Sequence, residues 1–281
     1  MKKFWLCCLL WGGFFTSNLT PAEGQPIGAV PFQKAEIAKA DDIVTDTEGN
    51  LYVLQDVSLK KFSGNGELLY SYSDFQAGTI ASIDASNPLK IMLFYKETGQ
   101  IVFLDQHLAP ISENMNLFDQ GYFNIAAAAY STAGYLWLFD ASTNDLIQLD
   151  LHFNEKARIH QNFQIATQNI TLQEIAEKRL VLTAANDGVY FFDAFGTFLK
   201  RLPIAATSIC QVTHNEIRYL HDNLLHCYQY ENLTEKAYRL GLPNIKQCLL
   251  QQDKVFFLNE NGDVLIGNVE HLSPINNDNA Q

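Results

Sequence analysis

Positively charged residues are few in this sequence. Lys and Arg total 19 against 31 Asp and Glu, so the 281-residue chain has a formal net charge of −12. A chain this acidic repels phosphate backbones and anionic membrane surfaces. Because the sequence also has no cluster of Lys or Arg with interleaved aromatic residues, we do not expect nucleic acid to be a partner.

Long apolar runs are scarce as well. The one extended run covers residues 4–15, which is shorter than the roughly 20 residues that a membrane-spanning helix needs. Lys2 and Lys3 precede this run, and small residues at Thr20 and Ala22 follow it, as in a secretory signal peptide. We therefore predict a signal peptide over residues 1–22, an exported protein and no transmembrane segment.

Motifs that identify a reaction are missing. The sequence has no phosphate-binding loop, no dinucleotide fingerprint and no nucleophile elbow. His214, His221 and His226 are close in sequence, but a strand between the first two would hold them about 20 Å apart, which is too far for one metal ion. The loops 46–50 and 259–263 are rich in Asp and Asn, yet they lack the rest of a calcium loop and are typical of tight turns.

What the sequence does contain is a segment that recurs about every forty residues. Each copy has an alternating apolar strand, a polar turn and a second alternating strand. The first apolar residues of the copies are Leu51, Ile91, Leu136, Leu180, Ile217 and Val255. Self-similarity at this period indicates one supersecondary unit copied in series, each copy unable to bury its apolar face alone.

Each copy extends to a four-stranded unit. A short apolar segment lies before every copy, and another follows each of the first five. Four antiparallel strands in about forty residues describe one blade of a β-propeller. Helical spacing is nearly absent, since only residues 171–180 fit one helical turn, and the same residues also fit a distorted inner strand.

The arrangement of the copies predicts a closed ring. The sixth copy ends after its third strand, while residues 26–34 precede the first complete blade without a partner. Placing residues 26–34 as the outer strand of the last blade removes an exposed edge, and prolines suit an outermost strand. We predict an all-β fold, a single six-bladed β-propeller over residues 23–272 closed by this N-terminal strand, and a disordered tail over residues 273–281. An open solenoid or a ring of five or seven blades is the alternative.

The cysteines leave two questions open. Cys210, Cys227 and Cys248 lie in the predicted propeller, and an odd number leaves at least one free thiol. Cys210 and Cys248 occupy the same place in successive repeats, so they form either a bridge between neighbouring inner strands or buried free thiols, and we expect the second. Cys7 and Cys8 lie in the N-terminal run, which leaves lipid attachment open beside simple cleavage.

One segment is less generic than the rest. Residues 82–90 join the first and second strands of blade two. In one interpretation Asp84, Ser86 and Asn87 form a polar rim that binds a partner. In the other, Asp84 or Asn87 bonds the backbone in an Asx-type turn and the following proline fixes φ. These three residues are the candidate binding residues.

The same part of the chain resembles a known family. Residues 84–95 and 100–105, together with residues 192–198 and 41–54, are similar to a family of uncharacterised exported proteins from Gram-negative bacteria. The resemblance covers the mature chain and is most specific in blade two. It implies a periplasmic or outer-membrane-associated six-bladed propeller, distantly similar to NHL and TolB-like propellers, and it implies no activity.

Two functions of different classes follow. The first is a non-enzymatic binding or scaffold protein of the cell envelope that presents one ring face to a protein partner or a small ligand. The second is a metal-assisted hydrolase or lactonase with a site at the central channel, because propellers host many chemistries. Three or more Asp, Glu, Asn or His side chains converging at a channel mouth would favour the second. We expect the first, with no catalytic residue, metal or cofactor.

Overall fold

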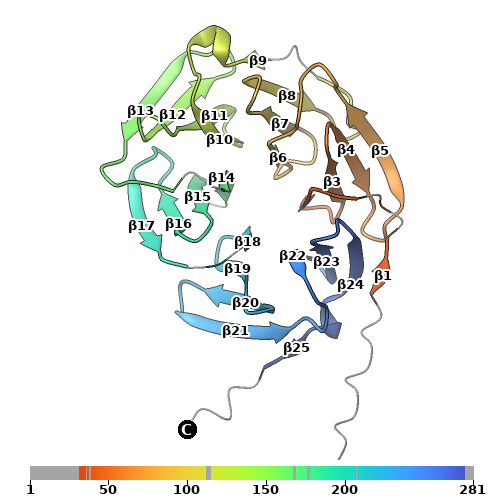
Figure 1. Ribbon diagram of the computed structural model, residues 1–281. Helices are drawn as coiled ribbons and strands as arrows, with labels where there is room; N and C mark the ends of the chain where they lie inside the picture. Colours follow the sequence, from red (N-terminus) through yellow and green to blue (C-terminus); the bar gives the residue numbers. More distant parts are fainter. Residues whose placement is uncertain are drawn as a thin grey trace, which may run out of the picture. The chain divides into compact units, whose positions relative to one another are not determined.

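The strands form six antiparallel sheets that are arranged as the blades of a ring (Figure 1). The computed structural model describes residues 32–35, 37, 39–111, 115–166, 169–175, 178–204, 206 and 208–275. The predicted all-β, six-bladed propeller is therefore confirmed. The predicted signal peptide, residues 1–22, lies outside the described residues. Among the residues described, no helix is long and apolar enough to cross a membrane.

Within each of the first five blades, and for the first three strands of the sixth, the strands follow one another in chain order from the ring centre outward (Figure 1). The first three blades contain β2 (Asp42–Thr45), β3 (Leu51–Gln55), β4 (Ser58–Phe62) and β5 (Leu68–Ser73); β6 (Ser82–Asp84), β7 (Ile91–Tyr95), β8 (Gln100–Leu104) and β9 (Met115–Asn116); and β10 (Ile125–Tyr130), β11 (Tyr135–Asp140), β12 (Asp145–Asp150) and β13 (Glu155–His160). The last three contain β14 (Ile170–Ile175), β15 (Arg179–Ala184), β16 (Gly188–Phe192) and β17 (Phe198–Leu202); β18 (Ser208–Val212), β19 (Glu216–His221), β20 (Leu224–Gln229) and β21 (Thr234–Arg239); and β22 (Ile245–Gln251), β23 (Lys254–Asn259) and β24 (Val264–Asn268). Short 3₁₀ turns cover Phe118–Gln120 and Val269–His271.

The N-terminal strand closes the ring as predicted. β1 (Gln33–Lys34) pairs antiparallel with β24 as the outer strand of blade six. The Lys34 ammonium lies 2.6 Å from the Asp263 carboxylate, and the Phe32 ring packs edge-to-face on Phe257 with centroids 4.9 Å apart. The remainder of the predicted closing segment, residues 26–31, lies outside the described residues.

The C-terminal end adds a strand where a disordered tail was expected. β25 (Ser273–Pro274) pairs with β21, so blade five has a fifth strand. The physical reason is the residue just before it, because Leu272 is buried in the same apolar cluster as Leu240 and holds the chain against blade five. The expected disorder is thus wrong for these two residues, while residues 276–281 lie outside the described part of the chain.

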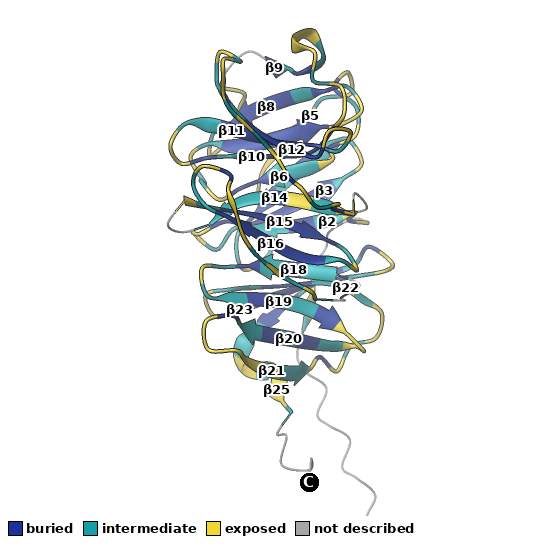
Figure 2. Ribbon diagram, turned by 90° about the vertical axis from the view of Figure 1, so that its left-hand side faces the viewer, coloured by how far each residue is buried: buried dark blue, intermediate teal, exposed yellow. Residues whose placement is uncertain are grey.

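The core lies between blades, and the strand pattern explains why. Successive side chains of a strand point to opposite faces of the sheet. In β11, Leu136 and Leu138 pack toward blade two, whereas Trp137 and Phe139 pack toward blade four. Because both faces are covered, the middle strands are buried and exposure is concentrated in loops and outer strands (Figure 2). Residues 170–175 form strand β14, which decides between the two alternatives for that segment.

Several of the tight turns that connect the strands share one hydrogen-bond pattern. An Asp or Asn at the end of a strand accepts hydrogen bonds from the backbone amides two and four residues later. Asp46 does so from residues 48 and 50 at 2.9 Å each, and Asn259 does so from residues 261 and 263 at 3.0 and 2.8 Å. The loops 46–50 and 259–263 are therefore turns, as predicted, and one side-chain oxygen each of Asp46 and Asn259 is already bonded to the backbone.

Candidate functional site

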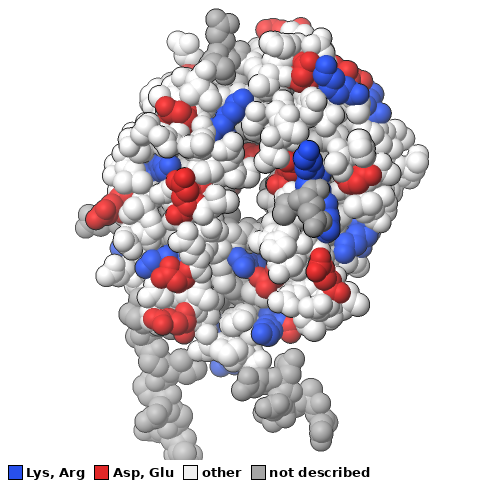
Figure 3. Space-filling view, turned by 180° about the vertical axis from the view of Figure 1, so that it is seen from behind, with Lys and Arg blue, Asp and Glu red and all other residues white. Residues whose placement is uncertain are grey.

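The inner strands of the blades surround a cavity of about 330 Å³ at the centre of the ring. Figure 3 shows the central opening on one face of the propeller. Residues of β2, β6, β14, β18 and β22 supply most of the wall, and Ala128 of β10 completes the circle. A site assembled this way takes one or a few residues from each blade, which is why no local motif in the sequence marks it.

The charged side chains of the described cavity lining are all acidic, and its other side chains are uncharged. Its carboxylates are those of Asp42, Asp46, Asp84 and Glu174. The remaining lining residues are hydroxyl, amide, thiol and aliphatic, and none of the described residues that line the cavity is Lys, Arg, His or aromatic. Such a wall favours a cation or a neutral polar group and disfavours phosphate or another anion.

Three of the four carboxylates are used to hold the protein together. Asp84 accepts hydrogen bonds from the amides of Ser86 and Tyr130, both at 3.0 Å, and so ties blade two to blade three. Glu174 accepts from the Thr132 amide at 3.0 Å and from its hydroxyl at 2.7 Å, which links blades three and four. Asp46 is occupied by its turn, as described above.

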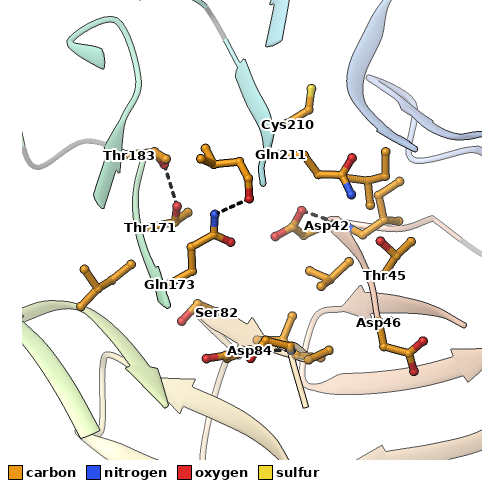
Figure 4. Close-up of a pocket in the computed structure, with 18 of the residues that line it drawn as sticks. Asp42, Thr45, Asp46, Ser82, Asp84, Thr171, Gln173, Thr183, Cys210 and Gln211 are labelled. Carbon is orange, nitrogen blue, oxygen red and sulfur yellow. Dashed lines mark hydrogen bonds between the residues drawn. The ribbon is translucent and has the colours of Figure 1, made fainter. Parts of the chain in front are cut away.

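Asp42 is different because its carboxylate is directed into the cavity. Figure 4 shows the side chains of Asp42 and Gln173 pointing toward each other from β2 and β14. Burial raises the pKa of Asp42 above its ordinary value of 3.8, although a hydrogen bond from the Ile43 amide at 2.9 Å and the nearby charge of Lys246 act in the opposite direction. A bound cation or hydrogen-bond donor would relieve this desolvation.

Glutamine side chains fix the wall around Asp42. Gln247 accepts a hydrogen bond from the Ile43 amide at 3.2 Å and donates to the Ile43 carbonyl at 2.9 Å, joining blade six to blade one. Gln173 donates to the Val212 carbonyl at 3.1 Å, joining blades four and five (Figure 4). Gln211 accepts a hydrogen bond from the Leu250 amide at 3.0 Å, joining blades five and six. The cavity is therefore preorganised, since its amides are held by backbone partners.

The structure places the three sequence-predicted residues in different surroundings. Asp84 and Ser86 line the cavity, whereas Asn87 does not. Asn87 accepts a hydrogen bond from the Leu89 amide at 3.0 Å, and Asp84 accepts one from Ser86, so the Asx-type turn chemistry is also present. Asp42 was not among the residues predicted from the sequence. The signal that could have found it is an acidic residue opening an otherwise apolar inner strand.

The thiol in the lining is not an activated nucleophile. Cys210, Cys227 and Cys248 are free and buried, as expected, and the Cys248 amide donates to the Cys210 sulfur at 3.3 Å. Burial raises the pKa of the Cys210 thiol to about 11, so it stays protonated at neutral pH. Within the described ranges no three His, Cys, Asp or Glu side chains gather as a metal site would require.

Comparisons with known proteins identify the fold alone. No family model matches the sequence, and no curated protein matches it. Among solved structures the chain is similar to streptogramin B lyase, with 10% identity over 85% of this chain and 86% of the other and a TM-score of 0.56. It is also similar to a catalytically inactive virginiamycin B lyase from Staphylococcus aureus with quinupristin, with 9% identity over 85% and 88% and a TM-score of 0.55. A third is the Pan2 WD40 domain of Neurospora crassa, with 9% identity over 84% and 88% and a TM-score of 0.52.

Proposed function

We propose that this protein is a non-enzymatic binding or scaffold propeller whose central cavity receives a cationic or neutral polar group of its partner. The observation that carries the proposal is the half-buried carboxylate of Asp42 in a cavity whose described lining has four acidic side chains and no basic one. Shielding this charge from water raises the pKa of Asp42, although the Ile43 amide, Lys246 and Gln247 act in the opposite direction. A ligand that supplies a positive charge or hydrogen-bond donors would add to the effect of these three groups.

We place this protein in the cell envelope as part of the same proposal. The features of residues 1–22 support export, and the resemblance in blade two to exported proteins of Gram-negative bacteria supports a periplasmic or outer-membrane-associated location. The distant similarity to NHL and TolB-like propellers that this resemblance implies is consistent with the same proposal. The prime candidate for the partner is an envelope protein that inserts a polar loop into the channel.

Binding is better supported than catalysis by the chemistry of the lining. Asp46, Asp84 and Glu174 hold turns and neighbouring blades, and the Cys210 thiol is protonated, so among the lining residues that the structure describes Asp42 is left as the titratable group directed into the cavity. One acid–base group without an activated nucleophile or a set of metal ligands gives no complete hydrolytic site. The likeness to two lyases lies near 10% identity and supports the fold without supporting their reaction.

Photo-crosslinking tests the proposal at single positions. A photoreactive residue at Ser86, in the cavity lining, should crosslink a specific partner in native envelopes, and the same group at the exposed Leu89 should not. Asp42→Asn should weaken the Ser86 crosslink without unfolding the protein. Equal crosslinking at Ser86 and Leu89, or a Ser86 product unaffected by Asp42→Asn, would show that the cavity is not the binding surface.

A further inference from the structure

A second cavity lies between blades four and five, away from the central channel. Its volume is about 390 Å³, which is within the range of small-molecule sites. Blade four supplies an apolar side and blade five supplies a polar, aromatic side. The lining residues are Leu202, Pro203, Ile204, Tyr219, His221, Tyr228 and Glu235.

Strand register brings the polar residues together on one face of blade five. Tyr219 of β19 lies directly opposite His226 of β20, and Tyr228 of β20 lies directly opposite Glu235 of β21. Because residues two apart on a strand share a face, all four side chains are on the same side of the sheet. Ile217, also on this face, packs in the apolar cluster between blades four and five. The four side chains therefore face blade four.

The Glu235 carboxylate is held in a fixed position. Its Oε1 atom accepts a hydrogen bond from the Tyr219 hydroxyl and is 3.2 Å from His226 Nδ1. The Tyr219 and His226 rings are stacked with centroids 4.9 Å apart. Burial is the main cause that raises the pKa of Tyr219, and the hydrogen bond to Glu235 adds to it. The Tyr219 hydroxyl therefore keeps its proton and donates a hydrogen bond to Glu235. His226 Nε2 is buried and has no hydrogen-bond partner among the described residues, so the polar groups of this cluster are not all satisfied by the protein.

Elsewhere the protein fills aromatic clefts between blades with its own cations. Lys200 Nζ lies 4.6 Å from the ring centroid of Tyr230 at the same interface between blades four and five. Lys90 Nζ lies 4.4 Å from both Phe103 and Tyr130 between blades two and three. The described residues that line the second cavity include two tyrosines and one carboxylate but no Lys or Arg. Unless His221 is protonated, a cation at this place would have to come from a ligand.

We propose that the cavity between blades four and five binds the ammonium group of a small organic cation. Glu235 is the counter-ion, and the faces of Tyr219 and Tyr228 contact the cation, as aromatic rings do for quaternary ammonium groups. Leu202 and Ile204 contact the alkyl part of the ligand. An anion is disfavoured because Glu235 is the acidic group of the lining and is unopposed there by Lys or Arg.

Calorimetry or ligand-observed NMR on the full chain tests the charge requirement. The probes are choline chloride and its neutral analogue 3,3-dimethylbutan-1-ol, which has the same shape without the charge. Choline should bind roughly tenfold more tightly, given the usual strength of cation–π and ion-pair contacts. Equal binding of the two probes, or no choline binding at all, overturns the proposal.

Matched variants locate the site. Glu235→Gln should weaken choline binding roughly tenfold, whereas Glu231→Gln removes the same charge from the exposed turn of the same hairpin and should change nothing. Tyr228→Leu should weaken binding while Tyr228→Phe preserves it, which keeps the test valid if a Glu235 variant misfolds. Loss of choline binding in Asp42→Asn with full binding in Glu235→Gln would assign choline to the central cavity and overturn the inference.

Discussion

Replacing Gly267 with alanine should push Phe32 off the last blade and weaken the closure of the ring. The Phe32 ring lies against the backbone of β24, where a Cβ added at Gly267 would be 2.2 Å from Phe32 Cδ1. Heavy atoms cannot approach this closely, so the ring has to move. The same ring also packs edge-to-face on Phe257, which limits where it can go.

The magnitude follows from overpacking and from lost burial. Inserting a methyl group into a packed contact costs about 1–3 kcal/mol in free energy of unfolding. Phe32→Ala should cost about 2 kcal/mol, less than a fully buried phenylalanine would, because Phe32 is half-buried. In the double variant the absent ring leaves room for the new methyl group. The two effects should therefore be non-additive by about 1–2 kcal/mol.

Urea unfolding of the four proteins, followed by circular dichroism, measures this coupling. A control is Phe75→Ala, because Phe75 is 81% exposed and should change stability by less than about 0.5 kcal/mol. In thermal unfolding each kcal/mol should shift the midpoint by about 2–4 °C for a domain of this size. Additive losses, or a Gly267→Ala variant as stable as the parent, would refute the packing argument.

Three further results are expected. Asp42→Asn should stabilise the fold at neutral pH, because burial raises the folded pKa of Asp42. The gain should fade as the pH falls through the raised folded pKa and should vanish below 3.8, where the acid is protonated in both states; a gain independent of pH would contradict the argument. Gln247→Ala should lower the free energy of unfolding by about 1–2 kcal/mol, since it removes both bonds to the backbone of Ile43, and an unchanged urea midpoint would argue against them. Cys210 and Cys248 should react with a thiol reagent only after unfolding, and fast labelling of the native protein would be inconsistent with their burial.

The blades could be predicted because side chains alternate between the two faces of a strand, so the pattern is visible in a few consecutive residues. Leu136 and Trp137 are neighbours in sequence and pack against different blades, so a run of apolar residues on both faces implies sheets covered on both sides. The closing strand followed from a count of strands, since blade six lacked one. β25 could not be predicted, because Ser273 and Pro274 have no alternating pattern and their pairing depends on the distant contact between Leu272 and blade five.

The sites were harder to predict because they form across strands and blades. Asp84 and Ser86 were identified by an unusual loop sequence, and the cavity includes them. Asp42 faces Gln173 of another blade, more than a hundred positions along the chain, and no spacing rule connects them. Tyr219 and Glu235 meet because two hairpin registers align them. Those registers depend on turn geometry as well as on the residues themselves.

Both described ends of the chain are fastened to neighbouring blades, β1 to blade six and β25 to blade five (Figure 1). A flexible peptide joining these ends would allow the chain to be cut at another connection between blades, giving a circular permutant in which β1 follows the other strands of blade six along the chain, while β25 still adds to blade five. In such a molecule the pairing of β1 with β24, which now closes the ring without a covalent link, would lie within one continuous stretch of chain. The break in the chain would move to whichever connection was cut.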